Sequence, residues 1–274
     1  MSAPGRRTAS RTVSRSEIPA EWEEHVEAFE RRFSLRFDSV TEFPKAYLDS
    51  LHEEASSDLG SSVVVASASD ASIIDDMAVL EWVANTTDVT DSARRSYLDH
   101  LLRIYRKLPA SPEACLRSGA CFVLAPEREG AILARELGWL DRAAGPQPGA
   151  KRISFRGGLL VGTTAVEVPK SGPGGRCAVV DGAIASGATL MVFMGQIVDS
   201  VSGFDIYAAH AAHGGVRALV KCGRDLGIDV RVFVGHISGR LNEKYYAVDP
   251  DDPDRLVVGD LGDTIAPIAG APGP

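Results

Sequence analysis

The segment from residue 177 to residue 197 reads CAVVDGAIASGATLMVFMGQI, and it decides the fold. A short apolar run ends at Asp181, a loop of small residues fills 182–189, and an apolar stretch of helical length follows. An apolar run bounded by an acid and a glycine is typical of a buried strand, and the stretch after the loop predicts a helix. Strand, tight loop and helix in this order indicate one unit of an α/β protein.

The same alternation continues on both sides of this segment. We expect strands at 63–65, 120–125, 152–155, 164–168, 177–180, 204–209 and 230–234. We expect helices at 73–84, 129–141, 187–202 and 214–226, with another that Thr90 or Ser92 caps. Buried runs separated by helices predict a mostly parallel, twisted sheet with helices on both faces. Ligands of such sheets bind beyond the carboxyl ends of the strands.

Composition divides the chain into three parts. Residues 1–16 are rich in Arg and Ser and contain no acid, which favours a disordered basic tail over a transit peptide. Residues 17–61 carry apolar side chains at helical spacing, Trp22 and Phe29 among them, and predict a small helical N-terminal extension. Residues 62–274 form the α/β domain, so we expect packing or oligomer contacts, but no chemistry, from the extension.

Charge and cysteine usage exclude several function classes. The 274 residues carry a formal net charge of -8, which argues against a sequence-independent nucleic-acid surface. The four cysteines form no CxxC pair and no zinc spacing, so we expect reduced thiols. No apolar run has the length of a membrane span and no hydrophobic signal core is present. We therefore expect a cytoplasmic protein with neither nucleic acid nor membrane as a partner.

The loop after Asp181 has the chemistry of a phosphate site. Small residues at 185–188 allow backbone N–H groups to approach a phosphate, and Ser186 and Thr189 add hydroxyl donors. The following helix presents unpaired N–H groups and its positive dipole end to the same anion. Asp181 is placed to accept hydrogen bonds from ribose hydroxyls. The loop lacks the Gly-Lys-Ser/Thr of a Walker motif and the GxGxxG of dinucleotide sites, and a plain strand-to-helix turn stays open.

This segment resembles the phosphoribosyl pyrophosphate (PRPP) motif of type I phosphoribosyltransferases. The resemblance implies PRPP binding by Asp181, Gly182, Ala183, Ile184, Ala185, Ser186, Gly187, Ala188 and Thr189. Gly182 stands where most of the family has a second acid, which suits the uracil phosphoribosyltransferase branch. The resemblance covers roughly residues 62–265 and implies the type I phosphoribosyltransferase fold for the domain at 62–274.

Two further stretches resemble arginine-bearing turns of that branch. LAPEREG at 124–130 is similar to its Pro-x-x-Arg-Ala-Gly turn, which implies a phosphate contact for Arg128, one residue closer to Pro126 than the pattern has it. ISFRGG at 153–158 resembles the strand that ends at the base of a mobile β-arm, and it implies PRPP binding by Arg156.

The acceptor half of the site resembles the family less closely. VVGDLGD at 257–263 is similar to the uracil-binding segment, which implies that Val257 and Gly262 offer backbone groups to an acceptor and that Asp263 lies near the ribose and metal. However, 249–256 is an insertion, and TIAPIAG replaces the residues expected after Asp263. Ser238 stands where the family has an aspartate.

The resemblance implies transfer of a 5-phosphoribosyl group from PRPP to a small acceptor, with release of pyrophosphate. Asp181 and Asp263 are the implied catalytic residues, and Mg2+ is the implied cofactor, held mainly by PRPP without dedicated protein ligands. Three readings stay open: transfer to a small acceptor of specialised metabolism, for which amino sugars are one example; uracil salvage to UMP; and a non-catalytic PRPP or nucleotide sensor. We expect a homodimer or a larger homo-oligomer.

Three histidines stand at or near the ends of predicted strands. His210 and His213 suggest a metal pair, and His236 suggests a general base. A hydrogen-bonded structural histidine is more common at such positions, so the sequence favours a structural role for each.

Overall fold

The structure is a computed structural model of the chain. It describes residues 61–86, 89–126, 129–143, 155–156, 159–160, 174–242 and 246–258. The tail predicted at 1–16, the extension predicted at 17–61 except for its last residue, and the strand predicted at 164–168 lie outside the described residues.

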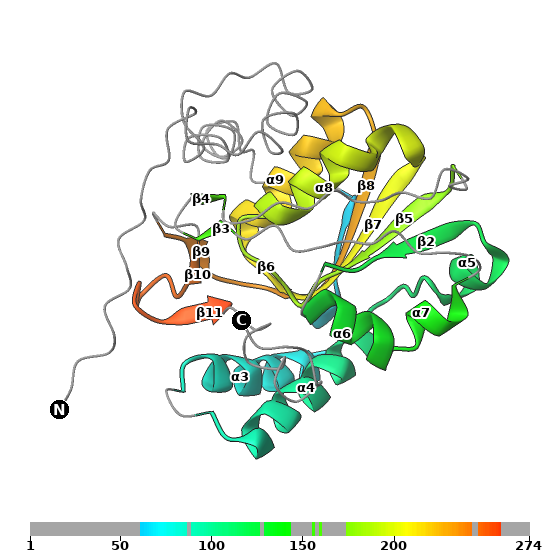
Figure 1. Cartoon of the computed structure of the whole chain (residues 1–274). Helices are drawn as coiled ribbons and strands as arrows, with labels where there is room; N and C mark the ends of the chain where they lie inside the picture. The colour runs from blue at the N-terminus through cyan, green and yellow to red at the C-terminus, as the bar shows by residue number, and fades with distance from the viewer. Residues whose placement is uncertain are drawn as a thin grey trace.

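A six-stranded sheet forms the centre of the described fold (Figure 1). Its order is β1-β8-β7-β5-β2, and β6 pairs with β7 beyond the end of β5. Every pair in this sheet is parallel. The strands are β1 (Val63–Val65), β2 (Cys121–Leu124), β5 (Arg176–Val180), β6 (Ala183–Ile184), β7 (Gly203–Ala211) and β8 (Asp229–Ile237). The mostly parallel sheet predicted from the apolar runs is therefore confirmed.

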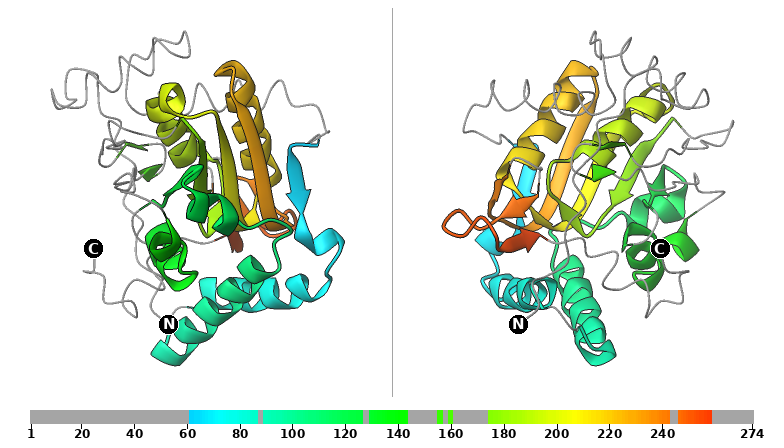
Figure 2. Two further views of the ribbon diagram at one scale, coloured as in Figure 1. Left: turned by 90° about the vertical axis from the view of Figure 1, so that its right-hand side faces the viewer. Right: turned by 60° about the vertical axis from the view of Figure 1, so that its left-hand side comes forward.

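Helices cover both faces of this sheet (Figures 1 and 2). One face carries α8 (Ala188–Ile197) and α9 (His213–Asp225). The other carries α3 (Ser72–Ala84), α4 (Asp91–Arg106), α6 (Glu129–Glu136) and α7 (Trp139–Arg142), with α5 (Glu113–Ser118) leading into β2. Alternate residues of each strand serve the two faces, since strand side chains alternate. Cys177 and Val179 of β5 join the α8/α9 core, whereas Ala178 and Val180 join the core on the other side.

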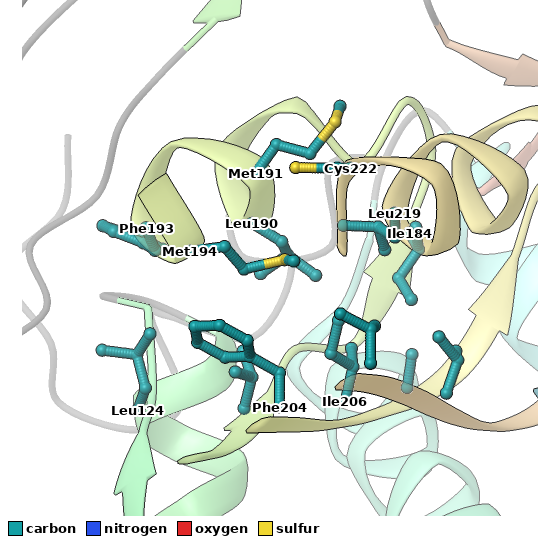
Figure 3. Close-up of a cluster of buried hydrophobic side chains, with 14 of the residues drawn as sticks. Leu124, Ile184, Leu190, Met191, Phe193, Met194, Phe204, Ile206, Leu219 and Cys222 are labelled. Atoms are coloured by element: carbon teal, nitrogen blue, oxygen red, sulfur yellow. The ribbon is translucent and has the colours of Figure 1, made fainter. Parts of the chain in front are cut away.

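The core on the α8/α9 face is continuous with the loop at 181–189, for which the sequence predicts phosphate binding. Figure 3 shows Ile184 beside Leu219 of α9 and near Ile206 of the sheet. Ile184 is 1% exposed, so burial of this side chain anchors the middle of the loop 181–189 in the core. The loop therefore starts and ends at elements that are fixed by the same hydrophobic cluster.

Several element boundaries differ from the sequence-based predictions. The single helix predicted at 129–141 is two helices, because Gly138 between them has a φ of 66°. The helix predicted at 187–202 ends at Ile197 and continues as the 3-10 turn η3 (Val198–Ser200). Of the two candidate caps for α4, Thr90 is the one used, since its side chain accepts a hydrogen bond from Ala93 N.

Short elements surround the sheet, and most of them were not predicted from the sequence; the strand at Phe155–Arg156 overlaps the one expected at 152–155. A 3-10 turn, η2 (Ala66–Ala68), follows β1. A small antiparallel sheet joins β9 (Arg240–Leu241), β10 (Ala247–Val248) and β11 (Leu256–Val258). A second antiparallel pair joins β3 (Phe155–Arg156) and β4 (Leu159–Leu160).

All four cysteines are free thiols, as expected. Among the described residues, no helix has the combined length and apolarity needed to cross a membrane.

Candidate functional site

Asp181 lies immediately beyond the carboxyl end of β5, and hydrogen bonds fix its main chain. Its N–H donates to the Tyr207 carbonyl of the neighbouring strand at 3.1 Å. Its side-chain Oδ1 accepts a hydrogen bond from the N–H of Gly182 at 3.0 Å. The carboxylate therefore closes its own turn, which is a structural use of Asp181 beside the ribose contact predicted from the sequence.

Tyr105 of α4 supports the same turn from the other face of the sheet. Its hydroxyl donates to the Asp181 carbonyl and lies 3.0 Å from the Tyr207 carbonyl. Burial, followed by the charges of Asp181 and Glu129, raises the pKa of Tyr105 well above its usual value. The hydroxyl therefore stays protonated and remains a donor to the turn.

The first half of the loop pairs with β7 as strand β6. The Gly182 carbonyl accepts from Ala209 N at 3.1 Å, and the Ile184 carbonyl accepts from Ala212 N at 2.8 Å. The Ile184 side chain is directed into the core, as Figure 3 shows. At 182–184, therefore, both of these carbonyls and the Ile184 side chain serve the fold.

The second half of the loop forms the start of α8. Gly187 precedes the helix with a φ of 76°, a conformation that glycine adopts without strain. Ser186 Oγ accepts a hydrogen bond from Ala188 N at 3.2 Å, while the side chains of Ala185, Ser186 and Thr189 stay partly exposed. The first turn of a helix presents N–H groups and a positive dipole end, so this half has the geometry to bind an anion.

Helix α9 touches the loop at its backbone. A Cβ on Gly215 would lie 2.0 Å from the Ala185 carbonyl oxygen, so only glycine permits this approach. This contact holds the phosphate-loop backbone against the N-terminal turn of α9.

Glu129 is a buried acid at this site that the sequence analysis did not select. Its residue surface is 7% exposed, and a Cβ on Gly182 would lie 2.0 Å from its Oε1 atom. The Glu129 charge, after burial, raises the pKa of Tyr97. The sequence feature that could have identified Glu129 as a site residue is its position in LAPEREG, next to Arg128, for which phosphate binding was predicted. The absence of a side chain at Gly182 is therefore explained by the carboxylate that occupies the space.

The predicted acceptor segment lies against the predicted phosphate loop. Val257, in β11, packs with Ala183 and Ala185 around the buried pair Ala212 and Ala247. Segments more than 70 residues apart in sequence therefore meet at the carboxyl end of the parallel sheet. The predicted loop and the predicted acceptor segment thus share one small apolar cluster.

The strand register extends this site toward β8. Ala183 of β6 pairs with His210 of β7, which pairs with His236 of β8. His210 is 2% exposed, and its Nε2 atom is hydrogen-bonded to Ser238 Oγ at 2.7 Å. Burial, together with His236, lowers the pKa of His210 to about 3, and the main chain of Val257 works against this lowering. His210 is thus a neutral structural histidine, as the sequence favoured.

The other predicted site residues are described in part or not at all. Arg156 belongs to β3, where it is paired with Leu159 of β4, and only its main chain is described. Arg128, Gly262 and Asp263 lie outside the described residues. Within the described residues, no group of three or more His, Cys, Asp or Glu side chains has a metal-binding arrangement.

No protein-family model and no curated protein matches the sequence. Among solved structures, the AQ2163 protein from Aquifex aeolicus is similar, with a TM-score of 0.52 and 17% identity over 74% of this chain and 97% of that chain. A hypothetical protein from Neisseria gonorrhoeae with bound ppGpp has a TM-score of 0.31 and 15% identity, over 51% of this chain and 80% of that chain. The likeness to the Aquifex aeolicus protein shows a shared α/β fold.

Proposed function

We propose that the chain is a type I phosphoribosyltransferase that transfers the 5-phosphoribosyl group of PRPP to a small acceptor. One observation carries the proposal: Asp181 directly follows the central strand β5, and a loop with a left-handed Gly187 leads from it into the N-terminus of α8. This is the arrangement that a sugar phosphate requires, with N–H donors for the anion and a carboxylate for the hydroxyls. The sequence likeness of 181–189 to the PRPP motif supports the same conclusion.

In the proposed reaction, an acceptor atom displaces pyrophosphate from the anomeric carbon of the ribose. The loop 185–189 holds a phosphate group of PRPP through its backbone N–H groups and through the hydroxyls of Ser186 and Thr189. The ribosyl centre gains positive charge as the leaving group departs, as in glycoside hydrolysis. Asp181, fixed by Tyr105 and Gly182, provides negative charge beside that centre, and catalysis rests mainly on positioning and electrostatics.

Mg2+ bound to the pyrophosphate group of PRPP would supply charge neutralisation for the leaving group. Asp181 is the described carboxylate closest in the chain to the phosphate loop, and it suits a hard cation that is held mostly by phosphate oxygens. We also propose that Arg128 and Arg156 bind phosphate oxygens of PRPP.

Val257 supports an acceptor position near the loop, because it packs on the same buried pair, Ala212 and Ala247, as Ala183 and Ala185 do. We propose a small acceptor other than uracil, since the insertion at 249–256 directly precedes this segment and Ser238 replaces an aspartate of the family. In the structure the Ser238 hydroxyl is hydrogen-bonded to His210. An aspartate at this position would bring a charged carboxylate, not a hydroxyl, to the neutral imidazole. Homo-oligomer formation remains part of the proposal.

Pyrophosphate release tests the proposal. The protein is incubated with Mg2+ and PRPP, alone or with uracil, other nucleobases or amino sugars, and PRPP affinity is measured by calorimetry in parallel. We expect PRPP binding and release that depends on an acceptor. Binding without release under any condition would indicate a sensor, and no PRPP binding would contradict the assignment altogether.

A further inference from the structure

Three histidines gather at the carboxyl ends of β7 and β8, next to the segment that carries Val257. The rings of His210 and His236 are stacked with centroids 6.0 Å apart and an interplanar angle of 10°. His213 begins α9, directly after β7, and its charge acts on His236. The cluster lies one and two strands away from Ala183 of the phosphate loop. Neighbouring strands are roughly 5 Å apart, so the main chain of His236 lies roughly 10 Å from that of Ala183.

His236 and His210 differ in what their ring nitrogens do. Nδ1 of His236 is hydrogen-bonded to Ser67 Oγ at 2.9 Å, and within the described part of the chain Nε2 has no hydrogen bond. The ring is only partly buried. By contrast, His210 is enclosed and its Nε2 is bound to Ser238. Only His236 therefore combines an oriented ring with a second nitrogen that is available to a ligand.

The Ser67 bond gives His236 the arrangement of an oriented base. Ser67 lies in η2, the turn after β1, and so approaches the ring from the side opposite to His210. A base that is held through one nitrogen by a third group presents the other nitrogen in a fixed direction. The same logic positions imidazoles in many hydrolytic sites, although here no nucleophile of the protein is involved.

We propose that His236 is the general base that removes the proton from the attacking N–H or O–H group of the acceptor. This inference rests on the proposed phosphoribosyl transfer. As the acceptor N–C or O–C bond to the anomeric carbon forms, the bond from that carbon to the pyrophosphate oxygen breaks and its electron pair leaves with pyrophosphate. In the tautomer whose Nδ1–H donates to Ser67 Oγ, Nε2 of His236 is unprotonated, and the acceptor proton passes to it and from there to solvent. The inference favours acceptors whose attacking group must lose a proton, such as an amine, an amide or a hydroxyl.

The surroundings of His236 keep it in the basic, neutral form near neutral pH. Burial, followed by the charge of His213, lowers the pKa of His236 from its ordinary value near 6.5. The group facing it from β7 is His210, and the group from η2 is the uncharged Ser67. On α3, which also packs on β8, Asp76 is bound to Lys107 and His100. A base that is neutral at the working pH can accept a proton from the acceptor there.

The test is the pH profile of pyrophosphate release for wild type and His236→Asn. Each is measured with Mg2+ and PRPP, both with the panel acceptor that gives the greatest release and with water alone. We expect the wild-type rate to fall as pH decreases, with a midpoint below 6.5. We expect His236→Asn to lose this limb and to lower the maximal rate by on the order of 10²-fold or more, with PRPP affinity unchanged within about threefold.

Two further variants separate base chemistry from structural damage. Ser67→Ala should move the midpoint of the acid limb and lower the rate less than His236→Asn does, because it releases the ring without removing it. His100→Asn removes a histidine on α4 that is bound to Asp76, and it should leave the profile unchanged. Circular dichroism at each pH verifies that the variants stay folded.

The outcomes distinguish this inference from the proposed function. If wild type releases pyrophosphate and His236→Asn does so at the same rate with the same acid limb, the base assignment is wrong while the transferase stands. If wild type binds PRPP but releases no pyrophosphate with any acceptor or with water, both transfer and the base assignment are overturned. Loss of PRPP affinity together with rate in His236→Asn would make it a binding residue and not a base.

Discussion

The hydroxyl of Tyr105 donates a hydrogen bond to the main-chain carbonyl of Asp181 across the face of the sheet. Tyr105 belongs to α4 and is 4% exposed, whereas Asp181 begins the phosphate loop beyond β5. The side of the sheet that carries no part of the loop therefore determines where the loop starts. The position of Asp181, which we propose as a ribose-binding residue, therefore depends on a hydrogen bond from α4.

Tyr105→Phe should lower both stability and PRPP affinity. It leaves the Asp181 carbonyl without this donor in a buried setting, which costs about 1–3 kcal/mol of the free energy of unfolding. Tyr97→Phe is the matched control, because the Tyr97 hydroxyl is buried and has no hydrogen-bond partner within the described residues. Urea unfolding should show a loss for Tyr105→Phe and little change or a gain for Tyr97→Phe; equal effects would argue against the Asp181 bond.

Gly182→Ala should destabilise the protein through its clash with Glu129. The new Cβ would lie 2.0 Å from Glu129 Oε1, which overpacks the site at a cost of about 1–3 kcal/mol. In a Glu129→Ala background the same substitution should cost less, and the two changes should couple by about 0.5–3 kcal/mol. Denaturant unfolding of the wild type, both single variants and the double variant measures this coupling. Strictly additive effects would show that the carboxylate does not set the requirement for glycine.

His210 should make the protein less stable as the pH falls below about 6.5. Its pKa in the folded state is about 3, against about 6.5 when unfolded, so below pH 6.5 the unfolded chain binds a proton that the folded chain rejects. Stability is fully present above pH 6.5 and declines by up to about 1.4 kcal/mol per pH unit as pH approaches 3. The slope of unfolding free energy between pH 6.5 and 5 should be shallower in His210→Gln. An unchanged slope would mean that His210 is protonated in the folded protein.

Asp181→Asn should separate catalysis from binding. Asparagine keeps an oxygen for the hydrogen bond from Gly182 N, so the turn should survive and PRPP affinity should change only a few-fold. The lost negative charge should reduce turnover by on the order of 10–10³-fold, because the charge acts mainly in the transition state. Calorimetry and pyrophosphate release on the same samples provide both quantities. Equally small changes in turnover and in PRPP affinity would show that Asp181 only stabilises the turn.

Periodicity predicted the regular part of this fold well. The apolar runs at 177–180, 204–209 and 230–234 correspond to β5, β7 and β8, because strands buried on both faces must be apolar throughout. Gly138 shows where this approach fails: the apolar pattern continues through it, but its positive φ divides the predicted helix in two. The small sheet of β9, β10 and β11 was missed because its strands have two or three residues, too few to show a period.

The candidate site was predictable only where residues are close in sequence. The loop 181–189 carries its own pattern of acid, small residues and hydroxyls, so its strand-to-helix geometry followed from the sequence. Glu129 beneath Gly182 and the pairing of His236 with Ser67 depend on segments that meet only after folding. A single sequence contains no local signal for such long-range contacts.

PRPP binding to wild type, Ser186→Asp and Thr90→Asp, measured by calorimetry with Mg2+, tests the central proposal most directly. Ser186, one residue before the N-cap Gly187 of α8, accepts a hydrogen bond from Ala188 N, and Thr90, the N-cap of α4, accepts one from Ala93 N. An aspartate oxygen can accept the same bond at either position. The two variants therefore add the same charge at a helix N-terminus and should both stay folded. We predict that wild type and Thr90→Asp bind PRPP with similar affinity, whereas Ser186→Asp, whose carboxylate repels the phosphate, loses binding by at least about 10²-fold. Equal affinity in all three proteins, or none in the wild type, would contradict the assignment of residues 181–189 as a PRPP site.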